Sequence, residues 1–368
     1  MKNILIITSE FPPGPGGMGN QAYNIATHLS NQGYHINIYA ASRAEYKDVI
    51  FDKEHLKLHI KRYAVNSPVK NLIKAFLYIV KNNNKNDVVF LSGTSPILLT
   101  LFIKWFTKWK TIAIIHGHEI LMARGQMRRM LKRALYSVAN IITVSDFAKR
   151  VLLENTNLRP NNIVTISNGV PLEKFGSISN IARKQPTNGT LKLLTVGSLT
   201  PRKGQHNVVN ALPIIKKIWG DVEYHMVGIP QEAERIKNLA NQLGVQNSVY
   251  IHGMLSNEDL FKIMLDTDVF IMLSETASDG DVEGFGIAII EANLLGIPAI
   301  GSKGCGIEGA ISNQYNGYLV DPKNADDIAN AINSITVNYA KYSNNAISWA
   351  KQHDWNILIE DYIKVINS

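Results

Sequence analysis

The chain has 368 residues, of which 45% are hydrophobic and 18% are charged, enough for two domains with sizeable cores. Its one cysteine, Cys305, excludes an internal disulfide, and no run of 18 apolar residues is present that could span a membrane. A short apolar run at the start leads directly into Pro12-Pro13-Gly14, which favours a buried first strand over a signal peptide. We therefore expect a cytoplasmic protein.

The net charge of +8 is divided unevenly along the chain. Residues 1–175 hold 23 Lys+Arg and 10 Asp+Glu, a balance of +13, whereas the remainder holds 15 and 20, a balance of −5. A basic half indicates an anionic partner: a membrane surface, a phosphorylated acceptor or nucleic acid. Because no zinc-finger spacing, RNA-binding signature or basic leucine zipper is present, nucleic acid is the least favoured of the three.

Strand-like apolar runs alternate with amphipathic helical runs along the whole chain. In the first half we predict strands at 3–8, 35–40, 57–63, 87–91, 111–115, 140–144 and 162–167, and helices at 19–32, 68–82, 96–108, 125–138 and 146–155. In the second half we predict strands at 191–197, 222–227, 248–251, 268–272, 298–300 and 317–320, helices at 203–217, 231–243, 256–265, 286–295 and 324–336, and more helix to the end. This alternation predicts α/β architecture with doubly wound parallel sheets. The polar, turn-rich stretch 175–189 is the best candidate for a linker.

The loop after the first strand contains a literal G-x-G-x-x-G, from Gly14 to Gly19. A dinucleotide-binding turn needs its first glycine at the strand end and an acidic residue at the end of the second strand. Here six residues separate Thr8 from Gly14, and Arg43 stands after the second strand. An NADP-dependent oxidoreductase, with Arg43 at a 2′-phosphate, is the weak alternative, and a loop without a ligand is another.

A second motif runs from Asp281 to Glu291 and reads D-V-E-G-F-G-I-A-I-I-E. Glycines just before a buried helix let its free N–H groups approach an anion closely. Glu283 would lie at the mouth of that helix, and Glu291 about 12 Å further along at about 1.5 Å per residue. Two acceptors with a phosphate-binding helix end between them suit a sugar nucleotide. The alternative is a solvated or structurally hydrogen-bonded carboxylate at either position.

This E-G-F-G-x4-E stretch resembles the E-x7-E element of retaining glycosyltransferases of family 4, which have the GT-B fold. The other stretches that match the family, in its order, are Gly16-Gly17-Met18, His116-Gly117-His118-Glu119, Val144-Ser145, Asn168-Gly169-Val170, Val196-Gly197 through Lys203-Gly204, and Asn316-Gly317-Tyr318-Leu319-Val320. The resemblance implies two Rossmann-like domains facing each other across a cleft. It divides the chain into an acceptor-binding domain at 1–172, a donor domain at 173–352 and a last helix at 353–368 that packs back on the first domain.

The resemblance also implies roles for single residues. The catalytic set would be His118, Lys203 and Glu283, with Lys203 neutralising the donor diphosphate and the other two positioning the hexose. The remaining donor contacts would be Gly16, Gly17, His116, Ser198, Arg202, Gly284, Phe285, Gly286 and Glu291, the last holding the ribose. The family usually has a basic residue where Ser198 stands, and Arg202 is expected to compensate. Which histidine contacts the donor stays open, with His118 favoured and a structural role as the alternative.

The chain is thus expected to move a hexose from a nucleotide-diphosphate sugar to a hydroxyl of a glycan or lipid-linked acceptor, with retention, in cell-envelope polysaccharide or glycolipid synthesis. The D-V-E-G-F-G form is similar to that of bacterial mannosyltransferases, which favours GDP-mannose over UDP-hexoses. No cofactor and no metal are expected. Two D-x-D triplets occur: Asp266 and Asp268 flank a helix-to-strand turn and are explained by capping, whereas Asp279 and Asp281 lie nearer the site and are the alternative metal ligands. Two rival functions use the same fold: a sugar-nucleotide epimerase or hydrolase, and a non-catalytic sugar-nucleotide-binding protein.

One further pattern concerns the surface of the basic half. The segment 98–110 places Trp105 and Trp109 at i and i+4 with Lys104, Lys108 and Lys110 around them, and the segment 124–133 adds five more cations. One interpretation is a core helix followed by a solvated helix. The other is an aromatic and cationic patch on the acceptor domain that binds the inner face of the cell membrane.

Overall fold

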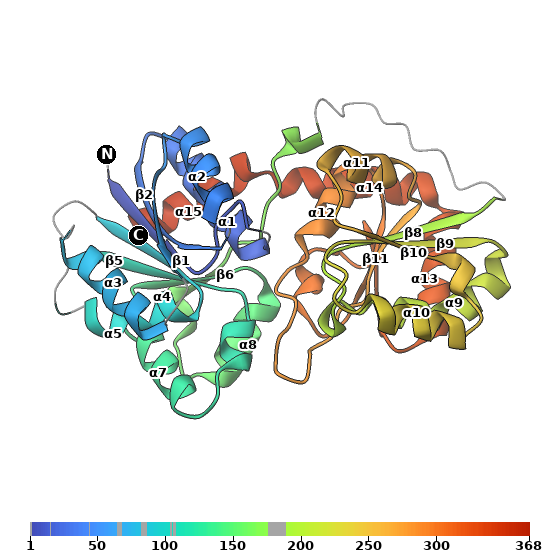
Figure 1. The fold of residues 1–368 in the computed structure, drawn as a ribbon, viewed down its shortest axis with the longest axis horizontal. Helices are drawn as coiled ribbons and strands as arrows, with labels where there is room; N and C mark the ends of the chain where they lie inside the picture. Colours follow the sequence, from blue (N-terminus) through green and yellow to red (C-terminus); the bar gives the residue numbers. More distant parts are fainter. Residues whose placement is uncertain are drawn as a thin grey trace. The chain divides into compact units, whose positions relative to one another are not determined.

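The computed structural model describes residues 2–14, 16–43, 45–64, 68–81, 87–103, 105, 108–175 and 189–368. The chain forms two compact units (Figure 1). Unit 1 comprises Met1–Asn168 and Trp355–Ser368, and unit 2 comprises Gly169–Asp354. Except for its two end residues, the predicted linker at 175–189 lies outside the described residues.

In the described residues, unit 1 is built on a seven-stranded parallel sheet of order β3-β2-β1-β4-β5-β6-β7. The strands are β1 (Asn3–Thr8), β2 (His35–Ser42), β3 (His59–Ala64), β4 (Val88–Ser92), β5 (Lys110–Ile115), β6 (Asn140–Thr143) and β7 (Ile163–Thr165). The chain runs outward from β1 to β3 and then returns to place β4 on the other side of β1. In doubly wound sheets, ligands bind where the strand order reverses in this way, beyond the carboxyl ends of the strands.

The helices of unit 1 include one from the far end of the chain. They are α1 (Gly17–Asn31), α2 (Glu45–Glu54), α3 (Pro68–Lys81), α4 (Thr94–Leu98), α5 (Thr100–Ile103), α6 (His118–Met122), α7 (Gly125–Leu135), α8 (Asp146–Asn155) and α15 (Trp355–Asn367). Helix α15 packs against α1: Trp355 is fully buried with its ring 5.9 Å from that of His28, and Gln21 donates a hydrogen bond to the Tyr362 hydroxyl at 3.1 Å.

Two sequence predictions for unit 1 are wrong. The single helix at 96–108 is two short helices, α4 and α5, and Trp105 and Trp109 therefore do not share a helical face. The continuous apolar character that suggested one helix reflects burial instead, because Ile97, Leu98, Leu99 and Ile103 are all in the core. The second error is an omission, because helices α2 and α6 were not predicted at all.

In the described residues, unit 2 is built on a six-stranded parallel sheet of order β10-β9-β8-β11-β12-β13. The strands are β8 (Leu191–Val196), β9 (Val222–Val227), β10 (Val249–Gly253), β11 (Val269–Met272), β12 (Ala299–Ser302) and β13 (Gly317–Val320). The helices are α9 (Gln205–Trp219), α10 (Ala233–Gln242), α11 (Asn257–Leu265), α12 (Ile287–Leu294), α13 (Ala325–Val337) and α14 (Tyr339–Gln352). The ends of these elements lie within two residues of the predicted ranges, except for α14, for which only further helix was predicted.

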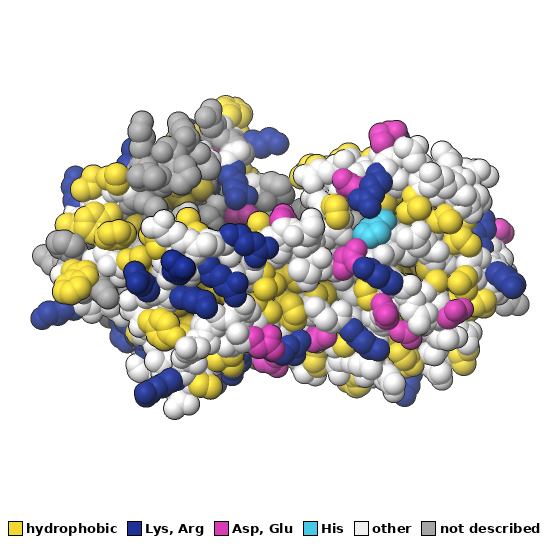
Figure 2. Space-filling model, turned by 90° about the horizontal axis from the view of Figure 1, so that it is seen from below, with side chains coloured by type: hydrophobic (Ala, Val, Ile, Leu, Met, Phe, Trp, Pro, Cys, Tyr) yellow, Lys and Arg dark blue, Asp and Glu magenta, His cyan; other side chains and the backbone are white. Residues whose placement is uncertain are grey.

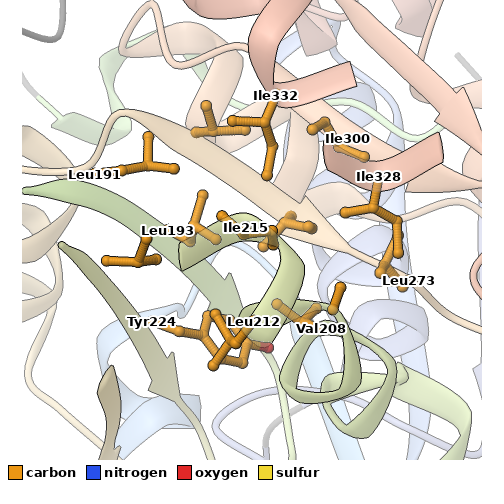
Figure 3. Packing of buried hydrophobic residues seen from close by; sticks show 14 of the residues in the cluster. Leu191, Leu193, Val208, Leu212, Ile215, Tyr224, Leu273, Ile300, Ile328 and Ile332 are labelled. Atoms are coloured by element: carbon orange, nitrogen blue, oxygen red, sulfur yellow. The ribbon is translucent and has the colours of Figure 1, made fainter. Parts of the chain in front are cut away.

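The core of unit 2 lies between its sheet and helices α9 and α13 (Figure 3). The labelled members of this core are Leu191, Leu193, Val208, Leu212, Ile215, Tyr224, Leu273, Ile300, Ile328 and Ile332. All are buried almost completely, and burial of a side chain of this size stabilises the folded state by about 1.5–3 kcal/mol. This core holds the carboxyl ends of β8 and β11, where the candidate site of unit 2 begins.

No helix among the described residues is long and apolar enough to cross a bilayer.

Candidate active site

In unit 2 the site begins with a short turn, Pro201–Lys203, between β8 and α9. Gly204, which ends the turn, has φ +71°, and a Cβ there would lie 1.8 Å from the carbonyl oxygen of Leu273. Only glycine fits this close crossing over the end of β11. A Cβ on Gly197 would lie 3.1 Å from Cε of Lys203, so the lysine side chain lies across the space that this glycine leaves. The two glycines thus fix the backbone position of the turn that carries Arg202 and Lys203.

Two cations converge on the carboxylate of Glu283. Nζ of Lys203 lies 2.7 Å from Oε2 of Glu283, and Nη1 of Arg202 donates to the same oxygen. Nε of Arg202 also lies 2.8 Å from Oδ2 of Asp281. Burial alone would raise the pKa of Glu283, but the charges of Lys203 and Arg202 outweigh burial and hold it at about 2. Glu283 is therefore ionised at neutral pH, and two carboxylates balance the two cations.

This arrangement bears on the position where the family usually has a basic residue. Ser198 stands there, and its carbonyl oxygen accepts a hydrogen bond from Nε2 of Gln205 at 3.2 Å. The direction of Arg202 could not be predicted, and the structure places its guanidinium at the same carboxylate as Lys203. The cluster thus contains two cationic side chains, Arg202 and Lys203, although position 198 holds no basic residue.

The glycine-rich turn after Glu283 leads into α12. Gly286 has φ +95° and precedes the helix, and no side chain among the described residues caps it. The N–H of Ile289 donates to the carbonyl oxygen of Gly286 at 2.9 Å, and the N–H groups of Ile287 and Ala288 have no acceptor within the helix. The N–H of Gly306 donates to the carbonyl oxygen of Glu283 at 2.8 Å, and a Cβ on Gly306 would lie 2.0 Å from the oxygen of Gly284. The loop after β12 thus holds the turn in place.

Phe285, which was predicted to contact the donor, has its side chain in the core. It is only 1% exposed, and its ring lies 5.8 Å from that of His353. Only its backbone could contact a ligand. The expected separation of about 12 Å between Glu283 and Glu291 assumed that the whole interval between them is helical. This assumption is wrong, because α12 begins at Ile287 and only the second half of the interval is helical.

Glu291 lies in α12 and has a partner that the sequence did not reveal. Its Oε1 accepts a hydrogen bond from Nζ of Lys174, which lies 117 residues earlier in the chain. Both side chains are partly exposed. The negative charge of Glu291 is therefore balanced by Lys174, and a ligand hydroxyl that binds this carboxylate would compete with Lys174.

The other candidate reactive or metal-binding groups of unit 2 have structural partners. The Cys305 thiol is buried, and burial raises its pKa to about 11, so it stays a neutral packing group at pH 7. The carboxylate of Asp279 accepts the N–H of Asp281 at 2.9 Å, and Asp266 forms an ion pair with Lys192. No group of three or more potential metal ligands occurs within the described parts of the chain.

Unit 1 has a second cluster at the carboxyl ends of its strands. Gly16 caps α1 and Gly17 begins it, and a Cβ on Gly16 would lie 2.3 Å from Oε2 of Glu10. Glu10 forms an ion pair with Arg43 at 3.0 Å. The carboxylate of Glu10, paired with Arg43, thus lies against Gly16 at the start of α1. Arg43, on which the NADP alternative depends, thus pairs with Glu10 in this structure.

The two histidines after β5 differ in their surroundings. His116 is buried, with Nε2 lying 2.8 Å from Oε1 of Gln21 and Nδ1 lying 2.9 Å from Oε1 of Glu119. His118 begins α6, has a more exposed ring, and has Nδ1 3.9 Å from Oε2 of Glu119. Both ring nitrogens of His116 thus have hydrogen-bond partners within the protein, whereas the ring of His118 is more exposed.

Glu119, interpreted from the sequence as a structural residue that could pair with a basic neighbour, anchors this turn. Its carboxylate accepts the N–H groups of His116 and Gly117 as well as the imidazole of His116. Burial alone would raise the pKa of Glu119, but the charge of His118 and the hydrogen bond and charge of His116 outweigh burial and hold it at about 2. A fully buried, ionised carboxylate thus fixes the orientation of the His116–Glu119 turn.

Comparison with known proteins identifies the family. The family profile "Glycosyltransferase Family 4" matches residues 15–174, and "Glycosyl transferases group 1" matches residues 177–353. The chain is a glycosyltransferase. It belongs to the family 4 and group 1 glycosyltransferases, and its two parallel-sheet units have the GT-B fold.

Relatives of this glycosyltransferase are distant but cover nearly its full length. A GDP-mannose-dependent alpha-(1-6)-phosphatidylinositol monomannoside mannosyltransferase of Mycobacterium tuberculosis is 22% identical, over 92% of this chain and 90% of the relative. A GDP-mannose-dependent monoacylated alpha-(1-6)-phosphatidylinositol monomannoside mannosyltransferase of Corynebacterium glutamicum is 24% identical, over 89% of this chain and 87% of the relative. Among solved structures, Anabaena HepE in complex with UDP and glucose aligns with a TM-score of 0.79 at 18% identity, covering both chains fully. Sucrose-phosphate synthase of Thermosynechococcus elongatus aligns with a TM-score of 0.81 at 16% identity, covering 100% of this chain and 98% of that one.

Proposed function

We propose that this glycosyltransferase moves a hexose, with retention of anomeric configuration, from a nucleotide-diphosphate sugar to a hydroxyl of a glycan or lipid-linked acceptor. GDP-mannose is the favoured donor and UDP-hexoses are the alternative, since the two relatives described above are named as GDP-mannose-dependent enzymes. The same relatives act on phosphatidylinositol mannosides, which supports a lipid-linked acceptor and work at the cytoplasmic face of the cell envelope. No metal ion takes part in this proposal.

The convergence of Lys203 and Arg202 on Glu283, at the start of α12, carries the proposal. As the bond between the anomeric carbon and the diphosphate oxygen breaks, negative charge grows on the diphosphate. Fixed cations and helix N–H groups aimed at such a charge supply the largest electrostatic stabilisation that these reactions need. In the donor-free protein, the carboxylate of Glu283 is the anion that pairs with Lys203.

The arriving diphosphate would take Lys203 from Glu283 and leave the carboxylate to accept hydroxyl groups of the hexose. Arg202 keeps Asp281 as its second partner, so its guanidinium stays at the site during this exchange. Glu291 would exchange Lys174 for the ribose hydroxyls. In unit 1, His118 would contact the hexose and the loop at Gly16–Gly17 would contact the acceptor.

The acceptor hydroxyl then attacks the anomeric carbon from the face that the diphosphate leaves. Its proton passes to an oxygen of the departing phosphate, so the products are the glycoside and the free nucleoside diphosphate. No side chain is needed as a covalent nucleophile, and the neutral Cys305 thiol does not supply one.

The proposal is tested with a panel of GDP-mannose, UDP-glucose, UDP-galactose and ADP-glucose. Release of nucleoside diphosphate is measured with and without short-chain lipid and glycan acceptors, and the anomeric configuration of the product is read by NMR. We expect acceptor-dependent release from GDP-mannose and an α-linked product. Inversion at the anomeric carbon would exclude the retaining mechanism.

The same assay decides between transfer and the rival function of a GT-B sugar-nucleotide epimerase or hydrolase. Conversion of the donor at an unchanged rate in the absence of any acceptor would favour the epimerase or hydrolase. Binding without turnover of every donor and acceptor pair would favour a non-catalytic sugar-nucleotide-binding protein.

A further inference from the structure

Three neighbouring helices of unit 1 expose large apolar side chains. The exposed positions are Ile73, Leu77 and Val80 on α3, Phe102 and Trp105 on and after α5, and Met127 on α7. Their side chains are between 38% and 78% exposed, with Trp105 the most exposed. Single exposed apolar residues are ordinary, but a contiguous set marks an interaction surface.

The set is contiguous because of the topology. Helices α3, α5 and α7 lie in successive crossovers of the chain from β3 to β6, and right-handed crossovers in one direction place them on one face of the sheet. They follow one another along that face in Figure 1. The rings of Phe76 and Phe102 meet edge to face at 6.4 Å and join α3 to α5, and α5 in turn contacts α7. We call this surface the α3–α7 face.

The same helices carry one sign of charge. Between residues 68 and 135 the sequence has two acidic residues, Asp87 and Glu119. Glu119 is buried, and Asp87 accepts the backbone N–H of Asn3 at 2.8 Å. The cations on and next to the three helices are Lys74, Lys81, Lys108, Arg124, Arg129, Lys132 and Arg133. Figure 2 shows Lys and Arg side chains among hydrophobic ones on this half of the molecule.

Helix α7 has the densest group of these cations. Arg129, Lys132 and Arg133 form no ion pair with any residue that the structure describes, and Leu131, Ala134 and Leu135 bury the opposite side of the helix. The exposed apolar residues of α2 offer a contrast: Val49 and Ile50 stand beside Asp48, Asp52 and Glu54 in the sequence. Apolar exposure without acidic neighbours is thus a property of the α3–α7 face.

We propose that the α3–α7 face docks on an anionic phospholipid bilayer. Leu77, Phe102 and Trp105 would enter the boundary between headgroups and acyl chains, and the cations of α7 would contact lipid phosphates. Amphipathic surfaces with aliphatic and aromatic side chains on one part and Lys/Arg on the rest bind bilayers in this way. A nucleic-acid surface would use the cations but would not need aliphatic side chains in the same patch. The inference does not depend on which donor the enzyme uses.

The test is sedimentation of the full chain with vesicles. Vesicles of phosphatidylglycerol and phosphatidylcholine are compared with vesicles of phosphatidylcholine alone, at low salt and at about 0.5 M salt, where electrostatic interactions are screened within a few ångströms. We expect binding to the anionic vesicles that weakens steeply with salt. Each cation near such a surface contributes a factor of about five to ten in partitioning, so the triple variant Arg129→Ala/Lys132→Ala/Arg133→Ala should bind roughly a hundredfold more weakly.

Matched variants separate this face from net charge and from misfolding. Lys217→Ala/Lys341→Ala/Lys351→Ala removes three exposed cations of unit 2 and should bind vesicles like the parent. Leu77→Ser/Trp105→Ser should weaken binding at both salt concentrations, whereas the control Ile218→Ser/Val337→Ser, at exposed apolar positions of unit 2, should not. Nucleoside-diphosphate binding, measured by calorimetry, should be the same for all of these proteins.

Three results would overturn the proposal. The parent fails to sediment with anionic vesicles at low salt, the unit 2 cation variant loses as much binding as the α7 variant, or single-stranded RNA displaces the vesicles at equal phosphate concentration. Face-dependent vesicle binding by a protein that binds no sugar nucleotide would leave this inference intact and overturn the proposed function instead.

Discussion

Replacing Glu283 by Gln separates donor binding from transfer. The substitution preserves shape and removes the charge that Lys203 and Arg202 share in the donor-free protein. We expect transfer to fall by roughly two to three orders of magnitude, because a positioned contact to the reacting sugar contributes about 2–4 kcal/mol in the transition state. Affinity for the free nucleoside diphosphate should not fall, and we expect it to rise, since the diphosphate no longer competes with a carboxylate for Lys203.

The same substitution has a stability effect whose sign follows from the pKa. Folding lowers the pKa of Glu283 from 4.5 to about 2, against burial, through Lys203 and Arg202. Such a group contributes stability that is fully present above its unfolded pKa and is lost as the pH falls through its folded pKa. At about 1.4 kcal/mol for each pH unit, the contribution at neutral pH is at most about 3.5 kcal/mol. The difference between parent and variant should therefore be largest near pH 7 and shrink toward pH 2.

The assay combines three measurements on parent, Glu283→Gln and the control Glu234→Gln, which removes an exposed carboxylate of α10. Transfer is measured at saturating donor, nucleoside-diphosphate affinity by calorimetry, and the free energy of unfolding in urea at pH 7, 5 and 3. Transfer within about threefold of the parent would refute the assigned role of Glu283. A stability difference that is the same at pH 3 and pH 7 would refute the ion-pair reasoning.

Three other perturbations test the remaining parts of the site. Lys203→Ala should weaken nucleoside-diphosphate binding by about ten- to a hundredfold, the range for a hydrogen bond to a charged group, and Arg202→Ala should weaken it less; the reverse order in calorimetry would exchange their roles. Gly204→Ala should lower the free energy of unfolding by about 2 kcal/mol or more, because its Cβ would lie 1.8 Å from the oxygen of Leu273 at a φ of +71°; an unchanged urea midpoint would contradict the required crossing. Transfer should continue in EDTA; loss of activity that Mg²⁺ or Mn²⁺ restores would make Asp281 a metal ligand.

Much of the fold could be read from local patterns. The strands of both sheets are apolar runs of a few residues, and the helices of unit 2 show a clear period of 3.6 residues. Where local pattern and burial disagree, the sequence misleads: the apolar run through Leu99 suggested one helix, but it is two short ones in a core.

The kinds of residue at the site could also be predicted, but not their partners. The glycines at 284 and 286, just before α12, predicted close backbone approach, and the two carboxylates on either side of them were recognised as site residues. The lysine that pairs with Glu291 and the glutamine that bonds His116 gave no signal in the sequence.

By itself, then, the sequence determined two parallel-sheet units, the family and the two carboxylates with a glycine turn between them, because hydrophobic period and motif spacing are local properties. The tertiary structure decided the destination of Arg202 and the commitment of His116 to Gln21 and Glu119. Arg202 meets Glu283 across 81 residues, and His116 meets Gln21 across 95. Contacts over such separations depend on which strands are neighbours and on which loops meet at their carboxyl ends, and no local pattern encodes that.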